Sequence, residues 1–166
     1  MENIIKFAYT GSISWDEVDN LLSFIKDADF LELDDVKDQG IKILMSNLDP
    51  QNALDAYHLS NICNSIILKN KSQEFILQNF DVVSASDEFQ KLDIAIVKDI
   101  LTTQPRNRCT QKIFEGILRW IVRDSEARKV YLSELFALLP FGLMNCKEVI
   151  RIATDEDILA IPLEHK

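Results

Sequence analysis

Apolar residues recur every three or four positions along most of the chain, and this spacing restricts the fold more than any other feature of the sequence. It predicts an amphipathic helix at about 15–27, introduced by a capping box formed by Ser14 and Glu17. Alternating apolar and polar runs, which predict β-strands, are nearly absent. The predicted fold class is therefore all-α, an array of stacked helical hairpins, with a short strand near Phe7 as an open alternative.

A second helix is predicted to pair with the first. Asp34 or Asp35 is expected to cap it, and Gly40 is expected to allow another backbone to approach. Its apolar stripe consists of Val36, Ile41, Leu44, Met45 and Leu48. These two helices predict a helical hairpin in the first third of the chain.

Capping residues and proline place the next helices. Asp49 is expected to cap a helix at about 51–62 with Pro50 at its first position, where the missing proline N–H costs nothing. The residues from Ile66 to Phe80 suit a long helix whose aromatic side chains face inward. Ser84, with Asp87 three positions later, predicts a short helix that ends near Gln90.

The last third begins with a short helix in "LDIAIVKDILTT" and a polar segment, "TQPRNRCT" at 103–110, that predicts a loop. Two more amphipathic helices follow, and Trp120 is expected in the core. For Trp15 the sequence leaves two alternatives open, a core position and a position in a partner interface. The predicted inward positions of the last two helices are Phe114, Ile117, Leu118, Ile121, Val130, Leu132, Leu135 and Leu138.

Charge and cysteine content restrict the partners. Lys and Arg number 18 against 27 Asp and Glu, and the resulting net charge of −9 repels nucleic acid and anionic membranes. Cys63, Cys109 and Cys146 are far apart and odd in number, which indicates a reducing compartment, the cytoplasm or else the nucleus. No apolar run approaches the roughly 20 residues of a membrane span.

The sequence contains few groups suited to catalysis. His58 lies five residues from Cys63, not at the i, i+4 spacing of one helical face, so a Cys–His nucleophile is only a minor alternative. Cys63 is expected to be a small buried apolar residue and His58 a solvated one. Calcium-loop spacing and a glycine-rich phosphate loop are both lacking. We therefore expect no enzyme activity, no cofactor and no metal.

Taken in order, these segments resemble the BTB-BACK, or kelch-like, family. "FAYTGSIS" followed by a hairpin is similar to the end of a BTB (POZ) domain, where a helix ends in F-x-Y-T-G. "NLDPQNALDAYHLSNICNSIILKNKSQEFILQNFDVVSASDEF" resembles the three-box and the start of BACK. "IFEGILRWIVRDSEARKVYLSELFALLPFGLM" resembles the later BACK pattern, with Pro140 where that pattern has arginine. The resemblance implies the C-terminal part of BTB at 1–48, BACK with its three-box at 49–145, and a partial BACK tail at 146–166.

The resemblance also implies a function. Such proteins are substrate adaptors of cullin-3 ubiquitin ligases, in which BTB dimerises and binds cullin-3 and a kelch propeller binds the substrate. Carried over by position, the implied partner-binding residues are Tyr9 and an outward face of the first three-box helix with Tyr57, His58 and Asn61.

The chain departs from the family pattern at both ends, so we expect a fragment or a relative that retains the helical connector. Cullin-3 binding is then expected to be weakened by the missing part of BTB, and substrates to bind through a module that this chain lacks. A monomer or weak self-association is expected. The alternative function is a cytoskeletal or self-association scaffold without a ligase role.

Overall fold

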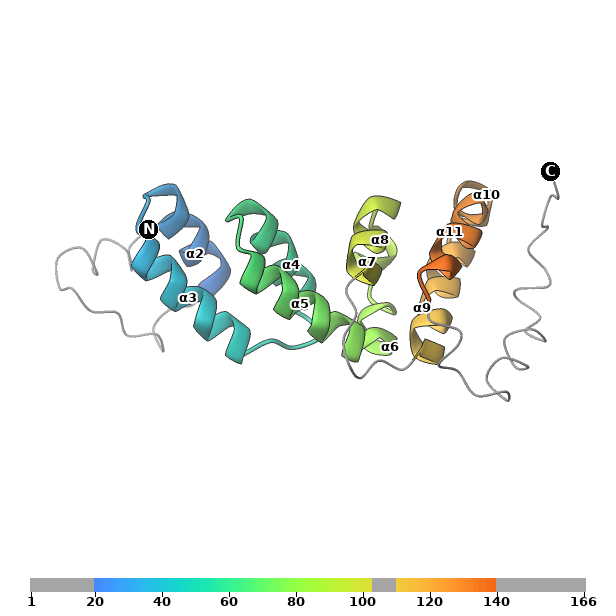
Figure 1. Cartoon of the computed structure of the whole chain (residues 1–166), viewed down its shortest axis with the longest axis horizontal. Helices are drawn as coiled ribbons and strands as arrows, with labels where there is room; N and C mark the ends of the chain where they lie inside the picture. Colours follow the sequence, from blue (N-terminus) through green and yellow to red (C-terminus); the bar gives the residue numbers. More distant parts are fainter. Residues whose placement is uncertain (1–19, 103–109, 140–166) are drawn as a thin grey trace. The chain divides into compact units, whose positions relative to one another are not determined.

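A computed structural model describes residues 20–102 and 110–139, and within these ranges every regular element is a helix (Figure 1). The predicted all-α fold class is confirmed. The helices are α2 (Leu21–Phe30), α3 (Asp34–Ser46), α4 (Ala53–Ile62), α5 (Ile66–Gln78), α6 (Phe80–Val83), α7 (Asp87–Gln90), α8 (Ile94–Thr102), α9 (Thr110–Val122), α10 (Ser125–Arg128), the 3-10 helix η2 (Lys129–Tyr131) and α11 (Leu132–Ala137).

Several predictions fall outside the described residues. They are the capping box of Ser14 and Glu17, the possible strand near Phe7, Trp15, and most of the predicted loop at 103–110. The first described helix begins at Leu21 and ends at Phe30, so the bounds predicted for it, about 15–27, are wrong: Asn20 is its N-cap, with Asn20 Oδ1 accepting from Ser23 N–H at 2.9 Å. Of the predicted loop, Thr110 already belongs to α9.

The chain divides into two compact units, and the division falls within α5, between Phe75 and Ile76. In the first unit α2 packs along α3 and against α4, as the predicted stripes require. Its core cluster consists of Ile25, Ile41, Leu44, Ala56, Leu59, Cys63 and Leu68. Gly40 faces the Ile25 side chain, not another backbone as predicted, and a Cβ at Gly40 would lie 2.8 Å from Ile25 Cγ1.

Two turns of the first unit, those that follow α2 and α4, share one backbone design. At the end of α2, Leu33 N–H donates to Ala28 O (2.9 Å) and Glu32 N–H donates to Asp29 O (3.1 Å). Glu32 has a φ of 57°, so this is a Schellman motif with glutamate in the left-handed position that glycine usually occupies. At the end of α4, Asn64 has a φ of 49° and Ser65 N–H donates to Ser60 O (2.9 Å). Both turns are thus closed by main-chain hydrogen bonds.

Two predicted caps of the first unit are wrong. Leu33 is the N-cap of α3, and the Asp34 carboxylate accepts instead from Lys37 Nζ at 2.7 Å. Asp49 does not cap α4, because its carboxylate accepts from Gln51 N–H and Asn52 N–H, both at 2.8 Å, in a turn that precedes the helix. Helix α4 accordingly begins at Ala53, after Pro50 and the other turn residues.

In the second unit α6, α7, α10 and α11 contact α9. Gly116 on α9 lets Phe80 come close, since a Cβ there would lie 2.5 Å from Phe80 Cε1. The rings of Phe80 and Phe89 meet edge to face at 5.2 Å, and Phe114 lies 5.0 Å from Phe136. An aromatic core therefore joins these helices.

The predicted core of α9 is confirmed, because Phe114, Ile117, Leu118, Trp120 and Ile121 are all buried. Leu132 and Leu135 are also buried, and Leu138 is half-buried.

Two other predictions for this unit are wrong. Val130 is 64% exposed, since the 3-10 helix η2 turns it outward. The cap of α7 is Ser86, whose Oγ accepts from Phe89 N–H at 3.2 Å, and not Ser84, whose side chain is buried.

Helix α5 is shorter than predicted. It ends at Gln78 and Phe80 begins the separate helix α6, although the Phe80 ring does face inward as predicted. Among the residues that the structure describes, no helix combines the length and the hydropathy needed to cross a membrane.

Candidate interaction site

Helix α4 carries three of the four predicted partner-binding residues, and it is buried on most of its surface. Tyr57 is only 2% exposed, so the prediction that it faces outward is wrong. Its ring meets the His58 ring at 5.6 Å, and Lys69 Nζ lies 6.0 Å from the ring centre. Six of the ten residues of α4 are buried, and the small side chains of Ala53 and Ala56 let neighbouring groups approach the helix closely.

Asn61 and His58 are more accessible than Tyr57. Asn61 is exposed, and His58 is half-buried at the edge of a pocket of about 260 Å³. Lys26 and Asp55 also line this pocket, so α2 and α4 together form it. Tyr9, the fourth predicted residue, lies outside the described residues.

Large apolar side chains are exposed at the two turns that follow α2 and α4. Phe30 is 85% and Leu31 44% exposed at the end of α2, and Ile62, Ile66 and Ile67 are 56%, 73% and 71% exposed around the turn between α4 and α5. Both turns lie at the same end of this unit (Figure 1). We call these five residues the apolar end patch. Exposed apolar residues that gather at one end mark an interaction surface more often than single ones do.

An ion-pair group holds the turn that carries Phe30. Lys37 Nζ lies 2.7 Å from Asp34 Oδ1 and 3.1 Å from Asp29 Oδ1, and its side chain is only 17% exposed. The hydrogen bonds to Asp34 and then Asp29 raise the pKa of Lys37 well above its usual range. Lys37 therefore stays charged and ties α3 to the end of α2, which positions the patch.

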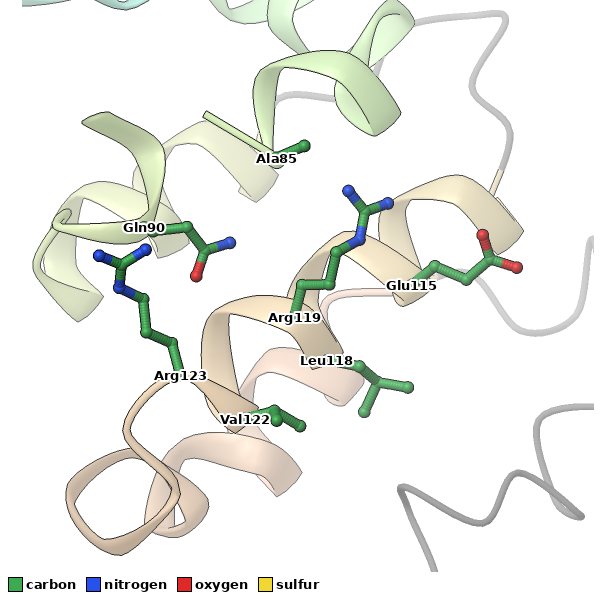
Figure 2. A pocket seen from close by; sticks show the side chains of 7 residues that line it. All are labelled: Ala85, Gln90, Glu115, Leu118, Arg119, Val122 and Arg123. Carbon is green, nitrogen blue, oxygen red and sulfur yellow. The ribbon is translucent and has the colours of Figure 1, made fainter. Parts of the chain in front are cut away.

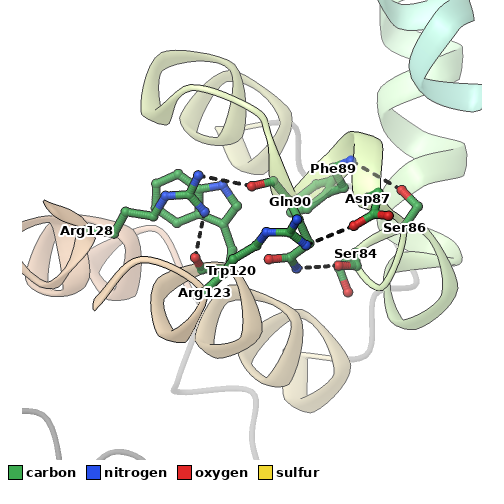
Figure 3. Close-up of polar contacts among 8 residues, drawn as sticks. All are labelled: Ser84, Ser86, Asp87, Phe89, Gln90, Trp120, Arg123 and Arg128. Carbon is green, nitrogen blue, oxygen red and sulfur yellow. Dashed lines mark hydrogen bonds and ion pairs between the residues drawn. The ribbon is translucent and has the colours of Figure 1, made fainter. Parts of the chain in front are cut away.

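Polar contacts of the second unit converge on Trp120 and Arg128 (Figure 3). The Arg128 guanidinium lies 4.1 Å from the Trp120 ring centre and donates to Trp120 O (2.8 Å) and Gln90 O (3.0 Å). Trp120 Nε1–H donates to Leu92 O at 3.1 Å. These bonds tie α7 and the residues after it to α9 and α10, so Trp120 and Arg128 have a structural role here.

The groups that could act chemically are few. Burial, followed by the nearby Asp29 carboxylate, raises the pKa of the Cys63 thiol, so that little reactive thiolate forms. Cys63 is buried, as the sequence predicted. Within residues 20–102 and 110–139, no three His, Cys, Asp or Glu side chains gather closely enough to hold a metal ion.

Comparisons with known proteins agree with this helical arrangement. The family model "BACK: BTB And C-terminal Kelch" matches residues 53–154. Kelch-like protein 38 of Homo sapiens is 32% identical over 136 residues, which cover 82% of this chain and 23% of that protein. Kelch-like protein 25 of Homo sapiens is 32% identical over 145 residues, covering 87% of this chain and 24% of the relative.

A third relative, Kelch repeat and BTB domain-containing protein 8 of Mus musculus, is 28% identical over 147 residues, again covering 87% of this chain and 24% of the relative. The chain therefore belongs to the BACK family, as a BTB-BACK protein of the kelch-like group. It spans about a quarter of the length of these curated relatives. The boundaries proposed at residues 48 and 145 stay predictions.

Proposed function

We propose that the chain is a non-enzymatic protein-interaction module, the adaptor or scaffold part of a cullin-3 ubiquitin ligase that links the ligase to a substrate-binding region. Family membership supports this proposal, since the relatives are named for kelch and BTB regions. The substrate would bind through a module outside this chain. We place this activity in the cytoplasm, with the nucleus as the alternative.

The observation that carries the proposal is the apolar end patch. Phe30, the most exposed large apolar side chain in the described residues, projects from a turn that Lys37 and main-chain bonds hold in place. Fully burying such a side chain contributes roughly 1.5–3 kcal/mol. A preformed turn also loses little conformational entropy on binding. Apolar anchors on rigid turns suit a protein partner better than a small polar substrate.

The residues carried over by resemblance would add contacts to those of this patch. His58 and Asn61 lie on α4 of the same unit and are accessible, and Tyr9 is retained as a third proposed contact. Tyr57 is not retained, because its substitution would disturb the core of the unit. The energy of a protein interface usually concentrates in a few buried anchors, so we assign the largest share to Phe30 and smaller shares to Asn61 and His58.

Calorimetric titration of the full chain with the N-terminal domain of cullin-3 tests the proposal. We expect 1:1 binding that Asn61→Ala weakens by roughly threefold and that Gln78→Ala, a solvent-exposed change on α5, leaves within about twofold. Absence of binding at high micromolar concentration would refute the cullin-3 assignment.

The alternative function, a self-association scaffold without a ligase role, draws on the same patch, because two copies could bury it against each other. Sedimentation of the full chain separates the two. A stable dimer that Phe30→Asp dissociates, together with no heat on mixing with cullin-3, would favour self-association. A monomer that binds cullin-3 would exclude it.

A further inference from the structure

The second unit contains a pocket that the adaptor function does not use. It has a volume of about 520 Å³ and lies between α9 and the segment from Ala85 to Gln90 (Figure 2). Its lining residues are Ala85, Gln90, Glu115, Leu118, Arg119, Val122 and Arg123. This volume is in the range of pockets that hold ligands, roughly 300–1,000 Å³.

The two arginines of the pocket differ in how fully their charges are compensated. Arg123 Nη1 lies 2.9 Å from Asp87 Oδ1, so that its charge is paired. Arg119 Nη1 donates only to the main-chain oxygen of Asp81, at 3.1 Å, while the Asp81 carboxylate pairs with Lys112. Within the part of the chain that the structure describes, Arg119 forms no ion pair with a carboxylate. Its positive charge is available to a ligand.

A buried polar atom of the same pocket also lacks a partner. Gln90 is only 6% exposed, and its Nε2 donates to Ser84 O at 2.7 Å. Its Oε1 accepts no hydrogen bond within the described residues. Figure 2 shows the Gln90 amide reaching toward the space bordered by Ala85, Arg119 and Arg123. An unpaired buried acceptor destabilises the fold, so a ligand that supplies an N–H donor removes this cost.

These features select the chemistry of the ligand. Arg119 requires an anion, Gln90 Oε1 requires a donor, and Leu118 with Val122, which is 51% exposed, supplies an apolar wall. A phosphate dianion fits less well than a single carboxylate, because one unpaired arginine balances only one charge and Glu115 on the same wall repels two negative charges more strongly than one. An acidic residue within a peptide supplies one carboxylate, main-chain N–H groups and a neighbouring apolar side chain.

We propose that this pocket binds an acidic segment of a partner protein, with a glutamate or aspartate carboxylate on Arg119, a main-chain N–H toward Gln90 Oε1, and an apolar neighbour against Leu118 and Val122. The chain as a whole carries a charge of −9, which disfavours acidic partners over most of its surface. Charge complementarity therefore concentrates such a partner at this pocket. The site shares no residue with the apolar end patch and does not require cullin-3.

The test is an NMR titration of the full chain with two capped tetrapeptides, alanine–glutamate–leucine–alanine and the same peptide with glutamine for glutamate. We expect the glutamate peptide to shift the Gln90 side-chain amide and the α9 amides, and to bind at least about fivefold more tightly than the glutamine peptide. Arg119→Gln should abolish this preference. Lys91→Gln removes the same charge outside the pocket and should keep it.

Arg119→Lys keeps the positive charge and serves as the second variant, in which the preference for glutamate should persist. The proposal is overturned if neither peptide shifts α7 or α9 resonances, if both bind equally, or if Arg119→Gln keeps the preference. Tighter binding of inorganic phosphate than of the glutamate peptide would overturn the assignment to a carboxylate.

Discussion

The helices of residues 20–75 and those of residues 76–139 are held by different kinds of contact. In the first unit, two turns closed by main-chain bonds bring apolar stripes together around Ile25 and Leu44. In the second, short helices are fixed by an aromatic core and by side chains that bind distant main-chain oxygens, as Arg128 binds Gln90 O. Different apolar residues can fill the core of the first unit, whereas the second unit depends on individual hydrogen-bond donors. Specific polar contacts should therefore be more costly to remove from the second unit.

The largest effect is expected at Trp120. Trp120→Ala should lower the free energy of unfolding by about 3–5 kcal/mol, because it empties a core position that is 1% exposed. Trp120→Phe keeps most of the apolar volume but leaves Leu92 O without its donor, and should cost about 1–3 kcal/mol. Urea denaturation measures both. If Trp120→Phe has no cost, the polar contact does not hold this unit.

Next come the two buried glycines, which compare the units directly. Gly116→Ala should destabilise by about 1–3 kcal/mol, because the new Cβ would lie 2.5 Å from both the Phe80 ring and Ser84 Oγ. Gly40→Ala brings its Cβ to 2.8 Å from Ile25 Cγ1 and should cost less, since an aliphatic chain yields more easily than a ring. Both substitutions raise the helix propensity by the same amount, so the difference between their urea midpoints measures the different cost of packing the new methyl group. Equal costs would contradict the comparison.

A smaller and opposite effect is expected at the turns of the first unit. Glu32→Gly should stabilise the chain by about 1 kcal/mol, because glutamate at a φ of 57° is strained and glycine is not. Asn64→Gly is the matched control at a φ of 49°, and since asparagine tolerates this conformation the change should stay within about 0.5 kcal/mol. Thermal unfolding checks both. A loss of stability in Glu32→Gly would show that the turn is held differently.

The smallest effect concerns pH. The hydrogen bond from Lys112 lowers the pKa of Asp81 below its ordinary value of 3.8. Asp81 thus contributes stability that is present above its unfolded pKa and is lost as the pH falls through its folded pKa. The Lys112 and Asp81 side chains are 50% and 37% exposed, so we expect this contribution to the free energy of unfolding to be only a few tenths of a kcal/mol. When the free energy of unfolding is measured against pH, Asp81→Asn should reduce the loss of stability at acid pH by that amount. An unchanged acid loss would refute this role of Asp81.

Sequence patterns predicted the helical fold and much of the core, because burial of Ile25, Val36, Ile41 and Leu44 follows directly from a period of 3.6 residues. Cap positions were less predictable. Ser84 and Ser86 are equally good acceptors by residue type, and tertiary packing buries one and leaves the other at the helix start. Local sequence does not distinguish them.

The candidate site was predicted only in part. Tyr57 was misplaced because α4 is surrounded by neighbours, which weakens the difference between its faces. Phe30 could have been found, since it lies off the stripe that contains Leu21 and Ile25. The second pocket could not, because Gln90 and Arg119 are brought together only by the packing of α7 on α9.

The central claim is that the apolar end patch, and not exposed apolar surface in general, binds cullin-3. The most direct measurement compares the dissociation constants of Phe30→Asp and Val130→Asp with that of the unchanged chain, by calorimetry with the cullin-3 N-terminal domain. Both side chains are exposed, at 85% and 64%, but only Phe30 belongs to the patch. We predict at least about tenfold weaker binding for Phe30→Asp and less than about twofold for Val130→Asp. Equal effects of the two substitutions, or no effect of Phe30→Asp, would contradict the account.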